Sequence, residues 1–145
     1  MSRRDDAPKT QQSGLSGILD SLAPTAHAVL RIGAGCLFLE HGLVKLFGWI
    51  TNATPVPLMS LMGLAGVLET VGGVMLILGL LTRPVAFILT GQMVVAYLMV
   101  HAPQGLWPIQ NKGELALLYA LIFAFLATHG AGPLSLDRLR HRRRP

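Results

Sequence analysis

The feature that most constrains this chain is a series of four apolar stretches joined by short polar connections. They cover roughly residues 26–47, 58–81, 84–102 and 114–129. An α-helix needs about 20 residues to cross the hydrocarbon core of a bilayer, with about 17 as the lower limit. The first two stretches meet this length, and the last two reach it only with their polar ends. Because short connections make neighbouring helices antiparallel, we expect an all-α integral membrane protein, an antiparallel four-helix transmembrane bundle.

The composition supports lipid as the surroundings of this chain. Only 13% of its 145 residues are charged and 52% are hydrophobic, against about 25% charged in a typical soluble domain. A cleaved signal peptide is the alternative for the first stretch, but about 25 mostly polar residues precede it. The single cysteine, Cys36, excludes an intrachain disulfide, and in mid-span a thiol acts as a small apolar side chain.

Four regions are expected along the chain. Residues 1–14 are polar and predicted to form a disordered cytoplasmic N-terminus. Residues 15–23 repeat their apolar side chains at helical spacing, which predicts an amphipathic helix on the membrane surface, ended by Pro24. The four-span domain then covers 24–135, and a basic cytoplasmic tail covers 136–145.

The orientation follows from the distribution of Lys and Arg. With four spans, the N-terminal region, the turn between the second and third stretches, and the C-terminal tail lie on one side of the membrane. Cytoplasmic loops carry the excess of cations, so both termini are expected in the cytoplasm. Anionic lipid explains the basic tail more simply than nucleic acid does, and we expect no nucleic-acid partner. The cations on this side are Arg3, Arg4, Lys9, Arg83, Arg138, Arg140, Arg142, Arg143 and Arg144.

Ionisable side chains interrupt the first apolar stretch. A charge at the centre of a bilayer costs roughly 2.5–3.5 kcal/mol, so these groups need partners. On a helical wheel Arg31 and Lys45 share a face with two glycines, with His41 just beside them. Because glycines let another helix approach closely, this face is predicted to turn toward protein. Glu40 lies almost opposite Arg31 and is expected to face a different neighbour or a second copy of the chain.

Glu69 lies near the middle of the second stretch. It is eleven residues past Leu58, about 16 Å along a helix and therefore near the midplane. A carboxyl group there must be neutral or paired. We expect it to pair with a cation of the first stretch, since the long stem of Lys45 could bend toward it.

Further polar residues collect at the outer ends of the third and fourth stretches. Two interpretations compete: polar groups that hold helices together, at about 0.6–2 kcal/mol per pair, or a pocket that binds a small molecule, a quinone head group or protons. A metal site built from His41, Glu69, His101 and Glu114 has suitable ligand types but no known spacing, and we expect no metal. Small residues at spacing four, from Ala116 to Thr128, predict a helix-packing seam. The binding candidates are Arg31, His41, Lys45, Glu69, Tyr97, His101, Asn111 and Glu114.

Four segments in this order resemble the DoxX family of small four-helix membrane proteins. They are "RIGAGCLFLEHGLVKLFG" (31–48), "ETVGGVMLILGLLTRPVA" (69–86), "NKGELALLYA" (111–120) and "GAGPLSLD" (130–137). The domain at 24–135 is therefore expected to be DoxX-like. Carried over position by position, the resemblance singles out Arg31, His41, Gly42, Lys45, Glu69, Gly72, Gly73, Gly79, Arg83, Asn111, Gly113, Glu114, Gly130, Gly132 and Asp137.

The resemblance implies a multi-pass protein of the bacterial inner membrane. Family members are often named oxidoreductases, after relatives similar to the DoxD subunit of a thiosulfate:quinone oxidoreductase. We therefore expect a quinone-linked subunit that works with other membrane or redox proteins. In it, Glu69 would exchange protons or bind the head group, Lys45 would be its counter-ion, His41 would relay protons or donate a hydrogen bond, and Arg31 would be an anchor on the cytoplasmic side. These first three are the candidate catalytic residues.

This chain contains no self-contained redox motif, so its enzymatic activity is left open. Any electron transfer would use a bound quinone or a partner subunit. The alternative is a non-catalytic scaffold or small-molecule transporter whose charged network is structural, and a homo-oligomer is a further open alternative.

Overall fold

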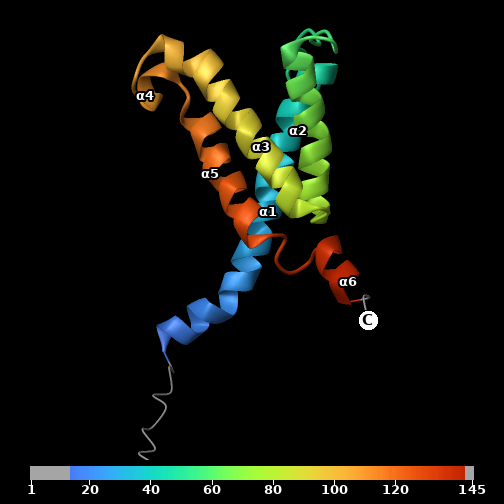
Figure 1. The fold of residues 1–145 in the computed structure, drawn as a ribbon, viewed down its shortest axis with the longest axis vertical. Helices are drawn as coiled ribbons and strands as arrows, with labels where there is room; N and C mark the ends of the chain where they lie inside the picture. Colours follow the sequence, from blue (N-terminus) through green and yellow to red (C-terminus); the bar gives the residue numbers. More distant parts are fainter. Residues whose placement is uncertain (1–13, 143–145) are drawn as a thin grey trace, which may run out of the picture.

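The computed structural model describes residues 14–142, which are helical with short connections and contain no strand (Figure 1). The expectations for residues 1–13 and for 143–145 at the end of the basic tail lie outside this part of the chain. The helices are α1 (Leu15–Phe47), α2 (Leu61–Leu78), α3 (Thr82–Ala96), α4 (Pro108–Asn111), α5 (Glu114–His129) and α6 (Leu136–Arg142). A π-helical turn (Tyr97–His101) and a 3₁₀ turn (Ala102–Gln104) continue α3.

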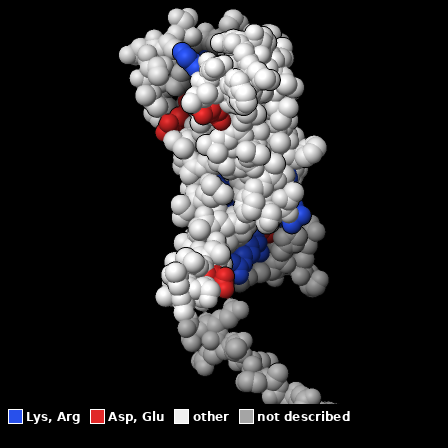
Figure 2. Space-filling model, turned by 90° about the vertical axis from the view of Figure 1, so that its left-hand side faces the viewer, with Lys and Arg blue, Asp and Glu red and all other residues white. Residues whose placement is uncertain are grey.

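Three of these helices are long and apolar enough to cross a membrane. They are α1 with 33 residues, α2 with 18, and the continuous helical segment Thr82–Gln104 with 23. The helix α5 has 16 residues, about 24 Å, which is short of the roughly 30 Å hydrocarbon core. Figure 2 shows a surface whose middle is almost free of charge, with the charged side chains gathered toward its two ends. The all-helical membrane fold is confirmed, and a fourth span stays a prediction.

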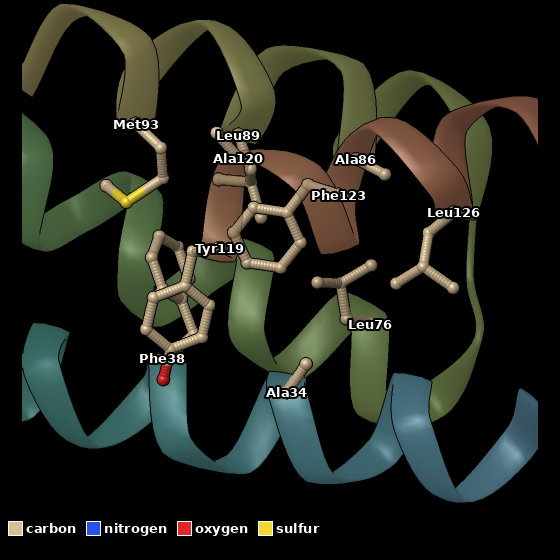
Figure 3. Close-up of a cluster of buried hydrophobic side chains, with 10 residues drawn as sticks. All are labelled: Ala34, Phe38, Leu76, Ala86, Leu89, Met93, Tyr119, Ala120, Phe123 and Leu126. Atoms are coloured by element: carbon tan, nitrogen blue, oxygen red, sulfur yellow. The ribbon is translucent and has the colours of Figure 1, made fainter. Parts of the chain in front are cut away.

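The helices associate as two pairs, α1 with α2 and α3 with α5. Figure 1 shows the pairs close together at the end near α6 and splayed apart at the end near α4. Figure 3 shows the buried cluster to which all four helices contribute, and Phe38 of α1 packs there edge-on against Phe123 of α5 with ring centres 4.8 Å apart.

Glycines on both helices bring α1 and α2 into close contact. A Cβ atom at Gly73 would lie 2.9 Å from the carbonyl oxygen of Gly35, and one at Gly42 would lie 2.6 Å from the backbone nitrogen of Thr70. Both distances are shorter than ordinary carbon contacts of about 3.5–4.0 Å. Arg31, Gly35 and Gly42 are buried on this face while Glu40 is exposed, so the predicted inward face of α1 is confirmed.

Pro24 does not end a helix, contrary to the sequence-based prediction. It lies inside α1, which runs unbroken from Leu15 to Phe47. A proline inside a helix removes one backbone hydrogen bond and commonly bends the axis, and Figure 1 shows the first turns of α1 at an angle to the rest. Residues 15–23 are thus the first turns of the first long helix and not a separate element.

Candidate functional site

An ion pair between α1 and α2 forms the centre of the candidate site. The Nζ atom of Lys45, in the last turn of α1, donates a hydrogen bond to Oε1 of Glu69 in the middle of α2. Glu69 is 2% exposed and the Lys45 side chain 24% exposed. The backbone of Gly66 lies against the base of the Lys45 side chain, where a Cβ would be 3.2 Å from Lys45 Cβ. A small residue at this position therefore lets the lysine fold down toward the carboxylate, and the expected pairing is confirmed.

Gln92 on α3 adds an amide to this ion pair. Its Nε2 atom donates to Oε1 of Glu69 at 3.2 Å and to the carbonyl oxygen of Ala65 at 3.3 Å. The sequence-based site did not include Gln92, although an amide within an apolar stretch was a signal for it. The contact ties α3 to the α1–α2 pair.

Two oxygen atoms at this centre have no hydrogen-bond partner among the described residues. They are Oε2 of Glu69 and Oε1 of Gln92, and both are buried. Buried polar atoms in folded proteins are nearly always hydrogen-bonded to protein or to water. These two acceptors are therefore available for hydrogen bonds from water or from a bound molecule.

A partly open pocket of about 250 Å³ lies beside these atoms, at the splayed end of the bundle. Apolar side chains dominate its wall, and its polar groups come from α1, α2, α3, the π-helical turn, the residue after α4 and the middle of α5. We call it the Glu69 pocket. It is lined by Phe38, His41, Lys45, Met62, Ala65, Glu69, Gln92, Met93, Ala96, Val100, His101, Lys112, Leu115, Ala116 and Tyr119.

The π-helical turn places His101 at this pocket. Its Nδ1 lies 2.9 Å from the carbonyl oxygen of Asn111, and since a carbonyl can only accept, Nδ1 must carry the proton. In the neutral ring Nε2 is then an acceptor, and it has no partner among the described residues. Such π-helical turns are rare and often occur at functional sites.

Asn111 is buried and holds the loop that precedes α5. Its side chain donates to the carbonyl oxygen of Gly105 and accepts from the backbone N–H of Gly113, each at 2.8 Å. Tyr97 stacks on the ring of His101 with centres 6.2 Å apart and does not line the pocket. Both predicted residues thus support His101 from outside the pocket.

Two other predicted residues lie outside the Glu69 pocket. Glu114 is exposed at the first position of α5 and does not line it. Arg31 lies toward the other end of the bundle, fully buried, where it donates to five backbone carbonyls. Two of these carbonyls belong to the last turn of α2, where the helix dipole favours a cation. We call this arrangement the Arg31 cage; its carbonyls are those of Leu76, Ile77, Ala131, Pro133 and Leu134.

Asp137 adds two hydrogen bonds at the Arg31 end of the bundle. Its carboxylate accepts hydrogen bonds from the backbone N–H groups of Leu81 and Thr82, at 2.8 Å each, where α3 begins. Burial by itself would raise the pKa of Asp137, but these hydrogen bonds and the charge of Arg140 together hold it below its ordinary value. The Arg31 cage and Asp137 therefore fasten the C-terminal segment to the helices.

Within residues 14–142, no group of three or more His, Cys, Asp or Glu side chains is placed to hold a metal ion. Of the four residues considered as metal ligands, His41, Glu69 and His101 line the pocket and Glu114 is exposed at the start of α5. The arrangement can hold a small molecule by hydrogen bonds, or exchange a proton through a carboxylate and an imidazole.

Comparison with known proteins confirms the family resemblance. The sequence profile of the DoxX family matches residues 26–102. Two proteins of Haemophilus influenzae, both described only as uncharacterized, are similar to the chain. One is 41% identical over 82% of this chain and 93% of its own length, and the other is 35% identical over 77% and 80%. No solved structure matches it. The chain belongs to the DoxX family.

Proposed function

We propose that this protein is a four-span component of the bacterial inner membrane with both termini in the cytoplasm. Arg83 and Arg138 line a surface cavity together with Asp137, and the charge of Arg140 acts on Asp137, so these cations lie at the Arg31 end. Lys112 lines the Glu69 pocket at the other end. This asymmetry supports a cytoplasmic Arg31 end by the positive-inside rule. Exposed Trp107 at the other end suits the opposite interface. The fourth span is α5, whose flanking polar residues extend its reach to the head groups.

We infer that the protein is a quinone-linked subunit of a redox complex, and that its quinone head group binds in the Glu69 pocket. The observation that carries this proposal is the pair of buried, unpartnered acceptors beside a cavity with a largely apolar lining. Binding sites for small molecules have this composition, mostly apolar with a few placed polar groups. A volume of about 250 Å³ is slightly below the usual range of roughly 300–1,000 Å³, which suits a head group of one or two rings.

The side chains around the pocket have distinct roles in this proposal. Glu69 binds the head group or exchanges a proton with it, and Lys45 is its counter-ion and orients the carboxyl group. His41, near the pocket mouth with its ring centre 6.1 Å from that of Tyr119, passes protons between the pocket and the outer surface. When bound, the quinone would supply the redox chemistry. Arg31 anchors the fold at the other end.

The test is to purify the protein in mild detergent, extract it with organic solvent and identify bound quinone by mass spectrometry. The wild-type protein should retain about one quinone per chain. Glu69→Gln should lose it, whereas Glu40→Gln, the same change on the exposed face of α1, should retain it. The proposal fails when wild-type protein carries no quinone, or when Glu69→Gln carries as much as wild type.

A non-catalytic scaffold is the second candidate, and the close glycine contact between α1 and α2 favours it. In that case the Lys45–Glu69 pair holds two helices in register. Glu69→Gln would then lower thermal stability and assembly without changing any quinone content or turnover. Measuring stability and quinone content on the same preparations separates the two functions.

A further inference from the structure

A second cavity lies at the Arg31 end of the bundle, away from the Glu69 pocket. Its volume is about 440 Å³, and it is lined by the turn between α2 and α3, the end of α5 and the segment that leads into α6. No residue lines both this cavity and the Glu69 pocket. We call it the Arg83 cavity; its polar lining residues are Thr82, Arg83, His129, Ser135, Asp137 and Arg138.

The Arg83 cavity has an excess of positive charge, since two arginines and one aspartate line it. Both carboxylate oxygens of Asp137 already accept hydrogen bonds from backbone N–H groups where α3 begins. Among the described residues the one ion pair joins α1 to α2, so no acid in that part of the chain is bound to Arg83 or Arg138. The two guanidinium groups are therefore available to an anion.

Gly130, directly after α5, makes room for the side chain of Arg83. Its φ is +81°, and a Cβ atom there would lie 3.1 Å from Nε of Arg83, closer than the usual 3.5–4.0 Å or so between non-bonded heavy atoms. The side chain of Arg83 thus extends from the start of α3 to the end of α5. A guanidinium group presents five N–H donors in a planar fork that matches two oxygens of a phosphate.

The Arg83 cavity lies at the depth of lipid phosphates. The helix α2 has 18 residues and ends at Leu78; its length of about 27 Å is close to that of the roughly 30 Å hydrocarbon core. Residues 81–84, which line the cavity, follow after two residues and so lie where the hydrocarbon meets the head groups. Figure 1 shows α6 beside this end of the bundle, where the backbone N–H of Asp137 donates to the carbonyl oxygen of Gly79 at 2.9 Å.

An apolar groove adjoins the Arg83 cavity. Its volume is about 580 Å³, and it lies between the end of α2 and α6; we call it the α6 groove. Leu78, Leu134 and Leu139 line it and are exposed. Ser135 and Arg138 line both the groove and the cavity, so the two spaces are adjacent. A ligand that fills both would carry an anionic head and an apolar chain.

We propose that the Arg83 cavity binds the phosphate of an anionic phospholipid, one of whose acyl chains lies in the α6 groove. Arg83 and Arg138 donate charge-assisted hydrogen bonds to the phosphate oxygens. A zwitterionic head group would bring an ammonium close to two guanidinium groups, which repel it. A free phosphate ion would leave the apolar side chains of the groove uncovered. The lipid site is separate from the Glu69 pocket, so it stands whether or not a quinone binds there.

The experiment is native mass spectrometry of delipidated protein in mild detergent, titrated with phosphatidylglycerol or with phosphatidylcholine of the same acyl chains. The wild-type protein should bind one phosphatidylglycerol about tenfold more tightly than phosphatidylcholine, since hydrogen bonds to a charged group contribute on that order. Arg83→Gln should remove most of this preference. Arg83→Lys should keep part of it, because the charge remains but the fork is lost.

Arg140→Gln is the matched control for the positive charge of the tail. It removes one cation from α6 at a position that lines neither the cavity nor the groove. Exposed charges outside a binding site contribute little, so the preference for phosphatidylglycerol should change by less than about twofold.

A second set of measurements separates a lipid from a free phosphate ion. Leu139→Ala should weaken phosphatidylglycerol binding about fourfold, the contribution of one buried CH₂ group. Leu121→Ala, the same change at an exposed position of α5 outside both spaces, should leave binding unchanged. A large molar excess of inorganic phosphate should displace little of the lipid, because the ion has no acyl chain.

Equal affinity of the folded wild-type protein for the two lipids overturns the anionic head group. Equal losses from Arg83→Gln and Arg140→Gln show a diffuse attraction by the tail and overturn the built site. Displacement by inorganic phosphate, or equal effects of Leu139→Ala and Leu121→Ala, overturns the acyl chain in the groove.

Discussion

Replacing Gly42 by alanine should separate α1 from α2 and disturb the site one turn away. The added Cβ would lie 2.4 Å from Oγ1 of Thr70 and 2.8 Å from the carbonyl oxygen of Gly66. Two of its three nearest atoms are backbone atoms of α2, so a side-chain rotation cannot relieve the clash. The helices must move apart, and Lys45, three residues further along α1, moves with them.

The size of the destabilisation can be isolated by comparing Gly42→Ala with a second substitution in the same helix. Gly33→Ala adds the same methyl group to α1 where no atom lies within 4 Å of the new Cβ. Both substitutions gain the same helix propensity, about 0.5–1 kcal/mol. The difference between their unfolding free energies therefore measures the cost of the clash at residue 42. Overpacking typically costs about 1–3 kcal/mol, and for a chain of this length that corresponds to roughly 3–9 °C in melting temperature.

The assay is thermal unfolding of the two variants in the same detergent, followed by quinone extraction. Gly42→Ala should melt several degrees below Gly33→Ala and hold less quinone. Equal melting temperatures would refute the close glycine contact as the element that aligns Lys45 with Glu69.

Three further outcomes are expected. Arg31→Lys should expose the C-terminal segment to proteolysis, because an ammonium with three donors cannot serve the five carbonyls of the Arg31 cage; resistance equal to wild type contradicts this. The Asp137 carboxyl has a lowered pKa in the folded protein, so its stabilisation is present above the unfolded value near 3.8 and is lost as pH falls through the lower folded value. Melting temperatures measured between neutral and acidic pH should show this loss in wild type and not in Asp137→Asn. Asn111→Ala leaves buried backbone groups of its loop unpaired, at about 1–3 kcal/mol, and should lower quinone retention through His101; unchanged retention would show that this loop does not position the imidazole.

The sequence predicted the apolar helices and the inward face of α1 because both follow from local patterns. Apolar runs of bilayer length can only be helices with satisfied backbones. Glycines at helical spacing beside cations indicate a close helix contact. The pairing of Lys45 with Glu69 could be predicted because the two residues lie on consecutive helices. Glu69 is the buried acid, and the lysine side chain is long enough to reach it.

The remaining features depend on contacts between distant segments. The carbonyls around Arg31 include those of Ala131, Pro133 and Leu134, about 100 positions away. Every residue has a backbone carbonyl, so the sequence cannot show which ones surround the arginine. Pro24 was predicted to end a helix by local rules, but α1 continues through it. The small-residue seam on α5 was partly wrong, since Ala116 and Ala120 are buried while Thr128 is exposed. Helical spacing shows which residues of α5 share one face. It does not show how far along that face the neighbouring helix stays in contact.

The most direct measurement of the central claim, that the embedded charges face one another within the bundle, is a double-mutant cycle on Lys45 and Glu69. Unfolding free energies would be measured for Lys45→Met, Glu69→Gln, the double variant and wild type under one set of conditions. Paired groups at this depth should show a coupling energy of about 1–3 kcal/mol. A coupling energy below about 0.5 kcal/mol, the range of independent sites, would contradict the account.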